Sequence, residues 1–202
     1  MANSDAKSKG GLGFLTVIDH PQHGLCGGYL VLNRCGRPLE FHCTTPIKPN
    51  RAQEILYGPT LKPFLYGEQI GQALLSKSKS ETLLICTDQE AALAVSDYTE
   101  VPVVLVLSHA APPTAETPRI DHASTAGDRA AEVTRRLDAA HPGSPVLYCF
   151  GLGRNELALP DGSAEKSKQI AERLGGLAES FDLSEPFSRI REAIEEAERA
   201  SR

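Results

Sequence analysis

The sequence lacks three features that would each point to a class of protein: a long apolar run, an excess of basic residues and a regular spacing of cysteines. Its longest apolar run, VPVVLVL at residues 101–107, suits a buried strand but is much too short to cross a bilayer. The 202 residues include 21 Lys and Arg against 26 Asp and Glu, a formal net charge of −5. The short apolar runs argue against a membrane protein. Proteins that bind duplex DNA by its phosphates usually present a basic face, so nucleic-acid binding is not the hypothesis that we favour.

The cysteines and the N-terminus indicate the compartment. Five cysteines are an odd number without regular spacing, so we expect reduced thiols rather than a disulfide framework. The N-terminus, MANSDAKSKGG, is polar and has no apolar stretch after its lysines, which argues against a secretory signal peptide and for the cytoplasm. We expect residues 1–12 to be a flexible tail and residues 13–202 to form a single domain, with a core at 13–140 and an extra strand and helices at 141–202.

The first part of that domain has the pattern of a small antiparallel sheet. Three short apolar segments, at residues 14–19, 28–32 and 39–44, are each bounded by turn residues and are predicted to be strands. The link at 33–38 is short enough for a hairpin, so the second and third strands should be antiparallel. We therefore expect a three-strand meander at the start of the fold.

Two helices should follow the meander. Asn50 is a good N-cap for a short helix over residues 51–57, and a longer helix is predicted over residues 62–78. The longer helix is apolar on two sides, and Gly67 and Gly71 fall one turn apart between those sides. This pattern predicts a helix packed between a sheet and another element.

The rest of the chain alternates between strands and helices. We expect strands at 82–88, 101–108 and 145–150, helices at 89–98, 130–140, 164–174 and 185–200, and a surface loop at 110–127. Alternation of strand, helix and strand with continuous apolar runs favours parallel neighbouring strands under helical cover. The last helix carries Phe187, Ile190, Ile194 and Ala197 on one face and Glu and Arg on the other.

This order of elements resembles the ribonuclease-H-like superfold, which is shared by RNase H, Holliday-junction resolvases and endonuclease V-type enzymes. The resemblance covers roughly residues 14–140 and rests on element order and acid placement. It implies a mixed sheet and a cluster of carboxylates that holds divalent metals, with one acid on the first strand, one on the first helix and one at the end of the fourth strand. The matching positions are Asp19, Glu68 and Asp88, with Asp128 or Asp121 as a fourth.

Such a cluster implies a definite chemistry, but each acid also has another explanation. Two Mg²⁺ or Mn²⁺ ions on these oxygens would stabilise the attacking water and the leaving oxygen of a phosphodiester. Glu68, however, lies in an apolar stripe, where it needs a cation, a proton or an arginine, unless the helix leaves it exposed. Asp88 precedes a predicted helix and suits an N-cap, and acids such as Asp19 commonly end strands.

The spacing H-x-x-H-x-x-C of His20, His23 and Cys26 gives a second metal hypothesis, a small zinc-stabilised module. No C-x-x-C motif accompanies it, so a polar loop beside a buried thiol is the favoured interpretation. GLGRN at 151–155 follows a predicted strand but lacks the third glycine of a dinucleotide fingerprint. We therefore assign no cofactor-binding residue, and the sequence leaves the cofactor open, with Mg²⁺ or Mn²⁺ expected only if the protein is a nuclease.

Three hypotheses remain. The first and favoured one is a non-catalytic interaction or scaffold protein with a ribonuclease-H-like α/β fold, which binds a protein partner or a second copy through the helix at 185–200. The second is a phosphodiesterase or nuclease that acts on nucleic acid with Mg²⁺ or Mn²⁺ at the carboxylate cluster. The third is the zinc-stabilised module.

Overall fold

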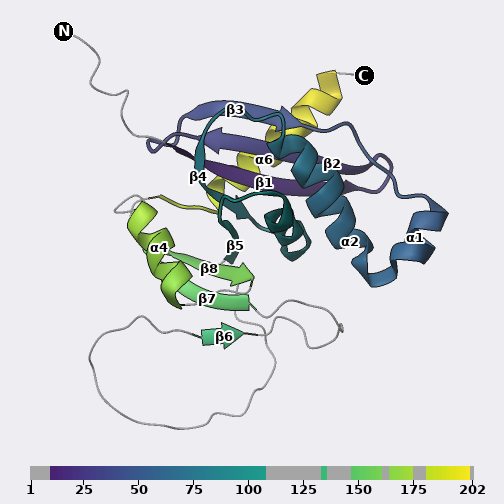
Figure 1. Ribbon diagram of the computed structural model, residues 1–202. Helices are drawn as coiled ribbons and strands as arrows, with labels where there is room; N and C mark the ends of the chain where they lie inside the picture. Colours follow the sequence, from purple (N-terminus) through teal and green to yellow (C-terminus); the bar gives the residue numbers. More distant parts are fainter. Residues whose placement is uncertain (1–9, 108–132, 136–146, 161–163, 175–180, 201–202) are drawn as a thin grey trace, which may run out of the picture.

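The computed structural model describes residues 10–107, 133–135, 147–160, 164–174 and 181–200, and these form one mixed sheet with helices on both faces (Figure 1). The strands are β1 (Gly11–His20), β2 (Gly24–Leu32), β3 (Pro38–Cys43), β4 (Thr82–Thr87), β5 (Val103–Leu107), β6 (Val133–Arg135), β7 (Leu147–Leu152) and β8 (Asn155–Pro160). Across the sheet they follow the order β3-β2-β1-β4-β5-β8-β7-β6. β1 is parallel to β4, and β4 to β5, whereas the other neighbours are antiparallel.

Helical segments connect and cover these strands, and they are labelled α where they are α-helices and η where they are 3₁₀-helices (η1 and η3) or a π-helix (η2). They are α1 (Arg51–Tyr57), η1 (Gly58–Thr60), α2 (Leu61–Pro63), η2 (Phe64–Gln72), α3 (Ala73–Leu75), η3 (Glu90–Tyr98), α4 (Ala164–Leu174) and α6 (Glu185–Ala200). The segments α2, η2 and α3 follow one another without a break, which confirms the long helix predicted at 62–78. Asn50 caps α1 in a reciprocal capping box with Gln53. Within the described ranges, no helix combines the length and apolar character needed to cross a membrane.

The α/β class and the mixed sheet expected from the sequence are confirmed. β1, β2 and β3 form an antiparallel meander, and β4, η3 and β5 form a unit with two parallel strands. The start of β1 corrects one prediction, because Gly11 and Leu12, expected in the flexible tail, belong to the strand and are buried. β1 lies between β2 and β4, so its first residues are covered by neighbours on both sides.

The strand predicted at 145–150 is one arm of a hairpin. It forms as β7, and the following strand β8, which the sequence did not indicate, turns back beside it. GLGRN at 151–155 supplies the turn between them, where Gly153 has a φ of 60°. A positive φ is readily adopted by glycine, so this glycine-rich stretch serves the hairpin rather than a nucleotide.

The helix predicted at 130–140 is wrong over the part that the structure describes. Residues 133–135 form β6, an edge strand that pairs antiparallel with β7. Pairing with a neighbouring strand is a non-local interaction, which helical periodicity in the sequence does not register. The loop predicted at 110–127 lies outside the described residues.

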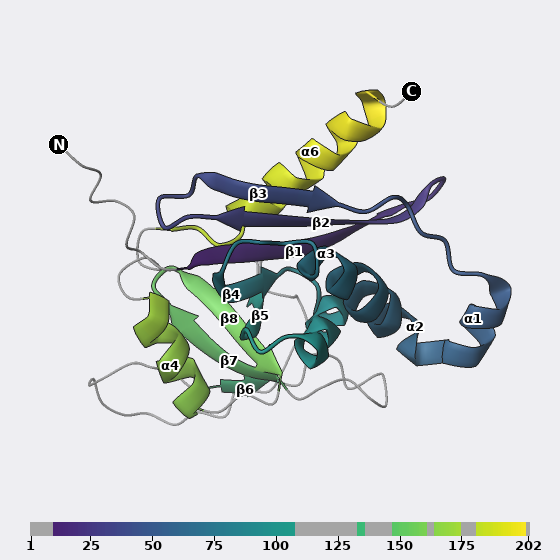
Figure 2. The same cartoon turned by 45° about the horizontal axis from the view of Figure 1, so that its top comes forward.

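Each face of the sheet carries its own apolar core. On one face α6 packs over the sheet, with Phe187, Ile190 and Ile194 buried against the side chains of β1 and β2. On the other face η2 and η3 cover the sheet, with Ile70 and Leu74 at the centre of that core. Figure 2 shows α6 and the η2 helix on opposite sides of the meander.

Two successive glycines of β2 allow these two helices to approach the sheet closely. Successive residues of a strand point to opposite faces. A Cβ on Gly27 would lie 2.1 Å from Cγ2 of Ile70, and a Cβ on Gly28 would lie 2.3 Å from Cγ2 of Ile190. Each glycine therefore makes room for a β-branched side chain of the helix above it.

The glycine notch of the long helix has a similar role on its far side. A Cβ on Gly67 would lie 2.6 Å from Cβ of Ala94, and a Cβ on Gly71 would lie 2.7 Å from Cγ2 of Val95. Both Ala94 and Val95 belong to η3, so the notch is where η3 packs. The prediction that this helix lies between a sheet and another element is confirmed.

We expect Gly28→Ala to destabilise the fold by about 1–3 kcal/mol, because the added methyl group overpacks the contact between β2 and α6. Urea unfolding followed by circular dichroism measures this change. Gly151→Ala is the matched control, since a Cβ there meets no atom within 4 Å, and it should change stability by less than about 0.5 kcal/mol. Equal effects of the two substitutions would contradict the close approach.

Candidate functional site

The carboxyl ends of β1 and β4 meet at a point that is organised by Gln89. Its side-chain amide donates to Val17 O at 2.7 Å, and its Oε1 accepts from Val17 N at 2.8 Å. β4 ends at Thr87, and beyond it the side chain of Gln89 makes the two hydrogen bonds to the backbone of β1 that a further strand residue would make. The segment that follows β4 is held in place by these two bonds.

Asp88, next to Gln89, does not cap the following helix as the sequence allowed. The N-cap of η3 is Gln89, and no side-chain hydrogen bond caps it. Asp88 instead forms an ion pair with Arg191 of α6, through Oδ2 and a guanidinium nitrogen. The carboxylate is 13% exposed and Arg191 is 42% exposed, so a mostly buried charge is neutralised by a cation at the surface.

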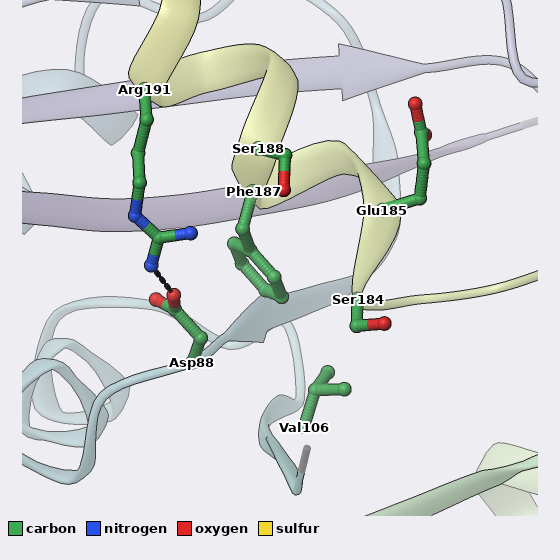
Figure 3. A pocket seen from close by; sticks show the side chains of 7 residues that line it. All are labelled: Asp88, Val106, Ser184, Glu185, Phe187, Ser188 and Arg191. Atoms are coloured by element: carbon green, nitrogen blue, oxygen red, sulfur yellow. Dashed lines mark hydrogen bonds and ion pairs between the residues drawn. The ribbon is translucent and has the colours of Figure 1, made fainter. Parts of the chain in front are cut away.

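The ion pair borders a recess of about 290 Å³ between the ends of the parallel strands and the start of α6. Its other lining residues are Val106, Ser184, Glu185, Phe187 and Ser188. Figure 3 shows Arg191 reaching down from α6 to Asp88, with the ring of Phe187 beside them. Hydroxyls and charges of both signs thus surround an apolar floor.

The start of α6 beside this recess is fixed by Asp182. Its Oδ1 accepts from Ser184 N at 2.9 Å and from Ser184 Oγ at 2.6 Å. The side-chain and backbone hydrogen bonds from Ser184 lower the pKa of Asp182 below its usual value. Asp182 is therefore an ionised structural group, which holds the entry to the helix.

The other two acids of the predicted cluster lie on the opposite face of the sheet. Asp19 is exposed near the end of β1 and stands opposite Leu25, which belongs to the core under η2. Burial and then the nearby Asp19 carboxylate raise the pKa of Tyr66 in η2. Glu68 is exposed on η2, so the alternative in which the helix leaves this carboxylate in solvent applies.

The histidines and the cysteine of the second metal hypothesis are divided between a turn and a core. The rings of His20 and His23 have centroids 4.5 Å apart in the β1–β2 turn, and His20 Nδ1 lies 3.3 Å from His23 N. Cys26 is buried under α6, and its Sγ donates to Thr44 O at 3.1 Å. The thiol therefore has a structural role in the core and in the contact between β2 and the residue after β3.

The grouping of possible metal ligands bears on both hypotheses. Among the residues that the structure describes, no three His, Cys, Asp or Glu side chains are grouped so that they could hold a metal ion. Asp19, Glu68 and Asp88 are thus not brought together as a ligand set, and neither are His20 and His23 with a third ligand. Asp121 and Asp128 lie outside the described residues.

Sequence reasoning missed two residues of this site: Arg191, which neutralises Asp88, and Gln89, which holds the segment after β4 beside β1. Arg191 stands four residues after Phe187 and one after Ile190, at the border of the apolar face of the last helix. This position in the sequence could have indicated a role for Arg191, because a cation at the border of an apolar helix face can reach the sheet below. Its partner was not visible, since Asp88 is 103 residues away in the chain.

A second polar cluster, partly exposed to solvent, forms around Glu40 of β3. Its carboxylate accepts hydrogen bonds from Ser80 Oγ at 2.8 Å, Lys79 N at 3.0 Å and Ser78 Oγ at 3.0 Å. His42 Nε2 lies 3.1 Å away on the same side. These bonds, that from Lys79 N first, lower the pKa of Glu40 to about 2. Glu40 therefore ties the connection between α3 and β4 to the edge strand.

Comparison of the chain with protein-family models and with curated proteins found no match.

We expect Arg191→Met to destabilise the fold by about 1–3 kcal/mol, because it leaves the Asp88 carboxylate buried without a cation; the partial exposure of Arg191 keeps the loss in this range. The double variant Asp88→Asn with Arg191→Met should recover part of the loss in thermal unfolding. Arg199→Met removes an arginine that is 70% exposed and should cost less than about 0.5 kcal/mol. No recovery in the double variant would contradict the pairing.

We expect the stability contributed by Glu40 to disappear in acid. Its pKa is about 2 in the folded chain against 4.5 ordinarily, so the contribution is complete above about pH 4.5 and is lost as the pH falls toward 2. Glu40→Gln should therefore lower the melting temperature at pH 7, and the difference from the wild type should shrink between about pH 4.5 and 2. Glu54→Gln, which alters an exposed pair with Arg51, is the control and should show no such convergence.

Proposed function

We propose that this protein is a non-catalytic interaction protein whose chain has a ribonuclease-H-like fold. The fold proposal is supported by the order β3-β2-β1-β4-β5, in which a meander is followed by two parallel strands beside β1. It is also supported by the long helix between β3 and β4 and by η3 between β4 and β5.

One observation carries the functional proposal: Arg191 of α6 neutralises Asp88. Asp88 is the acid that the resemblance places at the end of the fourth strand, where a metal would need its oxygens. With its partner supplied by the protein itself, the charge of the carboxylate is balanced without a bound cation, although its Oδ1 is buried with no hydrogen-bond partner among the described residues. Asp19 and Glu68 meanwhile face solvent on the other side of the sheet.

The exposed apolar side chains favour an interaction role. Among the described residues, the large exposed apolar side chains are Leu39, Phe41, Ile55, Leu56 and Tyr98. Ile55 and Leu56 belong to α1, which has no buried residue and projects from the body of the fold (Figure 2). Leu39 and Phe41 belong to β3, at one end of the sheet.

The helix at 185–200 contributes to a partner surface differently from our expectation. Its apolar residues Phe187, Ile190 and Ile194 are 2% exposed or less, because they form the core over the sheet. Any partner of α6 therefore contacts its polar side or its last turns. We therefore propose protein binding through the polar side or the last turns of α6, and not through its apolar face.

A nuclease assay tests the proposal. We expect the purified full chain, supplied with Mg²⁺ or Mn²⁺, to cleave single- and double-stranded DNA and RNA no faster than Asp19→Asn, because Asp19, Glu68 and Asp88 are not grouped as a set of metal ligands. Calorimetric titration with Mn²⁺ should show no stoichiometric binding. Cleavage by the wild type that Asp19→Asn abolishes would overturn the proposal in favour of the phosphodiesterase.

Elemental analysis of the same preparation tests the zinc-stabilised module. We expect no stoichiometric zinc, since Cys26 is buried in the core under α6 and, among the described residues, no group of three possible ligands forms around the two histidines of the turn. Zinc at one equivalent that is lost on His20→Ala would support the module instead.

A further inference from the structure

The strand β3 offers an open edge for pairing. It stands at one end of the strand order among the described elements. Thr44, directly after β3, donates its N–H to Gly27 O of β2 at 2.9 Å. Because backbone groups in an antiparallel strand alternate in direction, the N–H and C=O of Phe41 and Cys43 point away from β2.

The side chains along this edge form an apolar face beside α6. Phe41 stands opposite Leu30, which lies in the core under α6, so Phe41 is on the same face of the sheet. Phe41 is 38% exposed, and Leu39, at the register shift near the start of β3, is 52% exposed. Cys43, opposite Gly28, is also exposed on this face. An uncovered apolar edge of this kind is a template for a further strand.

The charge that usually protects an edge strand is directed elsewhere. Glu40 is the acidic residue of β3, and it points to the opposite face, where Ser78, Lys79 and Ser80 hold it. It therefore cannot repel a strand that approaches beside Phe41. Edge strands are commonly protected by charged side chains, prolines or bulges. β3 has Pro38 and a register shift between the pairs Val31–Glu40 and Leu32–Pro38, so this protection lies at its start, whereas the stretch from Phe41 to Cys43 has neither.

The end of α6 extends past this edge. The core contacts of the helix end at Ile194, and Glu195, Glu196 and Arg199 beyond it are exposed. In both Figure 1 and Figure 2 the last turns of α6 run beyond β3. The helix crosses β2 at Gly28, whose partner on β3 is Cys43, so the overhang lies over the last residues of β3.

We infer that β3 pairs antiparallel with β3 of a second copy of this chain, about a two-fold axis near Phe41 and His42. The inference rests on the proposed interaction function and names its partner. Antiparallel pairing brings the start of β3 in one copy beside the end of β3 in the other. The two sheets then become continuous, and Leu39 and Phe41 of both copies are covered together.

Charge complementarity selects a second copy over an unrelated strand. The exposed Arg34 and Arg37 lie in the turn before β3. Pairing places this turn of one copy beneath the α6 overhang of the other, where Glu195 and Glu196 pair with Arg199 of the same helix and leave a net negative charge on these three side chains. An acidic helix end thus meets a basic turn, and the two-fold axis creates the same contact twice.

Light scattering coupled to size-exclusion chromatography tests the inference. We expect the wild type to be a dimer that dissociates on dilution, and Phe41→Lys to weaken the dimer by about tenfold or more, because it replaces an apolar contact by a charge in each copy close to the axis. Leu56→Lys puts the same charge on the exposed α1 and is the matched control; its dimer should match the wild type. Circular dichroism confirms that both variants are folded.

Disulfide trapping gives a second readout. In a Cys35→Ser background, Phe41→Cys should form a covalent dimer on mild oxidation, because pairing about either Phe41 or His42 places residue 41 opposite residue 41 or Cys43 of the other copy. Directly opposed residues have Cα atoms about 5.5 Å apart, within the range of a disulfide. Leu56→Cys in the same background should remain monomeric under denaturing electrophoresis.

The outcomes separate this inference from the proposed function. A wild type that is monomeric at all concentrations, or a dimer that Leu56→Lys breaks and Phe41→Lys does not, overturns pairing through β3. Neither result affects the proposal that the protein lacks catalysis. Metal-dependent cleavage that Asp19→Asn abolishes overturns the proposed function, whatever the oligomeric state.

Discussion

The structure depends on how closely two helices can approach a single strand from opposite sides. Gly27 and Gly28 of β2 make this possible, because each omits a side chain where a β-branched residue of a helix must sit. Ile70 of η2 fills one space and Ile190 of α6 fills the other. A side chain at either glycine would push one helix outward and open the core beneath it.

The position of α6 then decides the electrostatics of the region where the parallel strands end. With Ile190 seated on Gly28, Arg191 comes within reach of Asp88 at the end of β4. The carboxylate is mostly buried and would be unstable there without a cation. The same helix that completes the apolar core therefore also neutralises the acid, so the packing of α6 and the neutralisation of Asp88 have one cause.

The polar cluster around Glu40 and the open edge of β3 are likewise two sides of one arrangement. Alternation along β3 directs Glu40 toward the connection between α3 and β4, where several donors hold it. The same alternation directs Phe41 to the other face, where the described residues leave it partly exposed. Glu40, which anchors β3, thus places no charge beside Phe41, and this part of the edge stays apolar and open to association.

The sequence by itself determined the elements whose pattern is local: the meander, the long helix with its glycine notch and the helices that begin at Ala164 and Glu185. Periodicity, caps and turn residues act over a few positions, which is why these predictions held. It also supplied the acids, but only the tertiary structure decided their state, because Asp88 and Arg191 are 103 residues apart in the chain. The strands β6 and β8 escaped prediction for the same reason, since a short strand is stabilised by the neighbour it pairs with and not by its own residues.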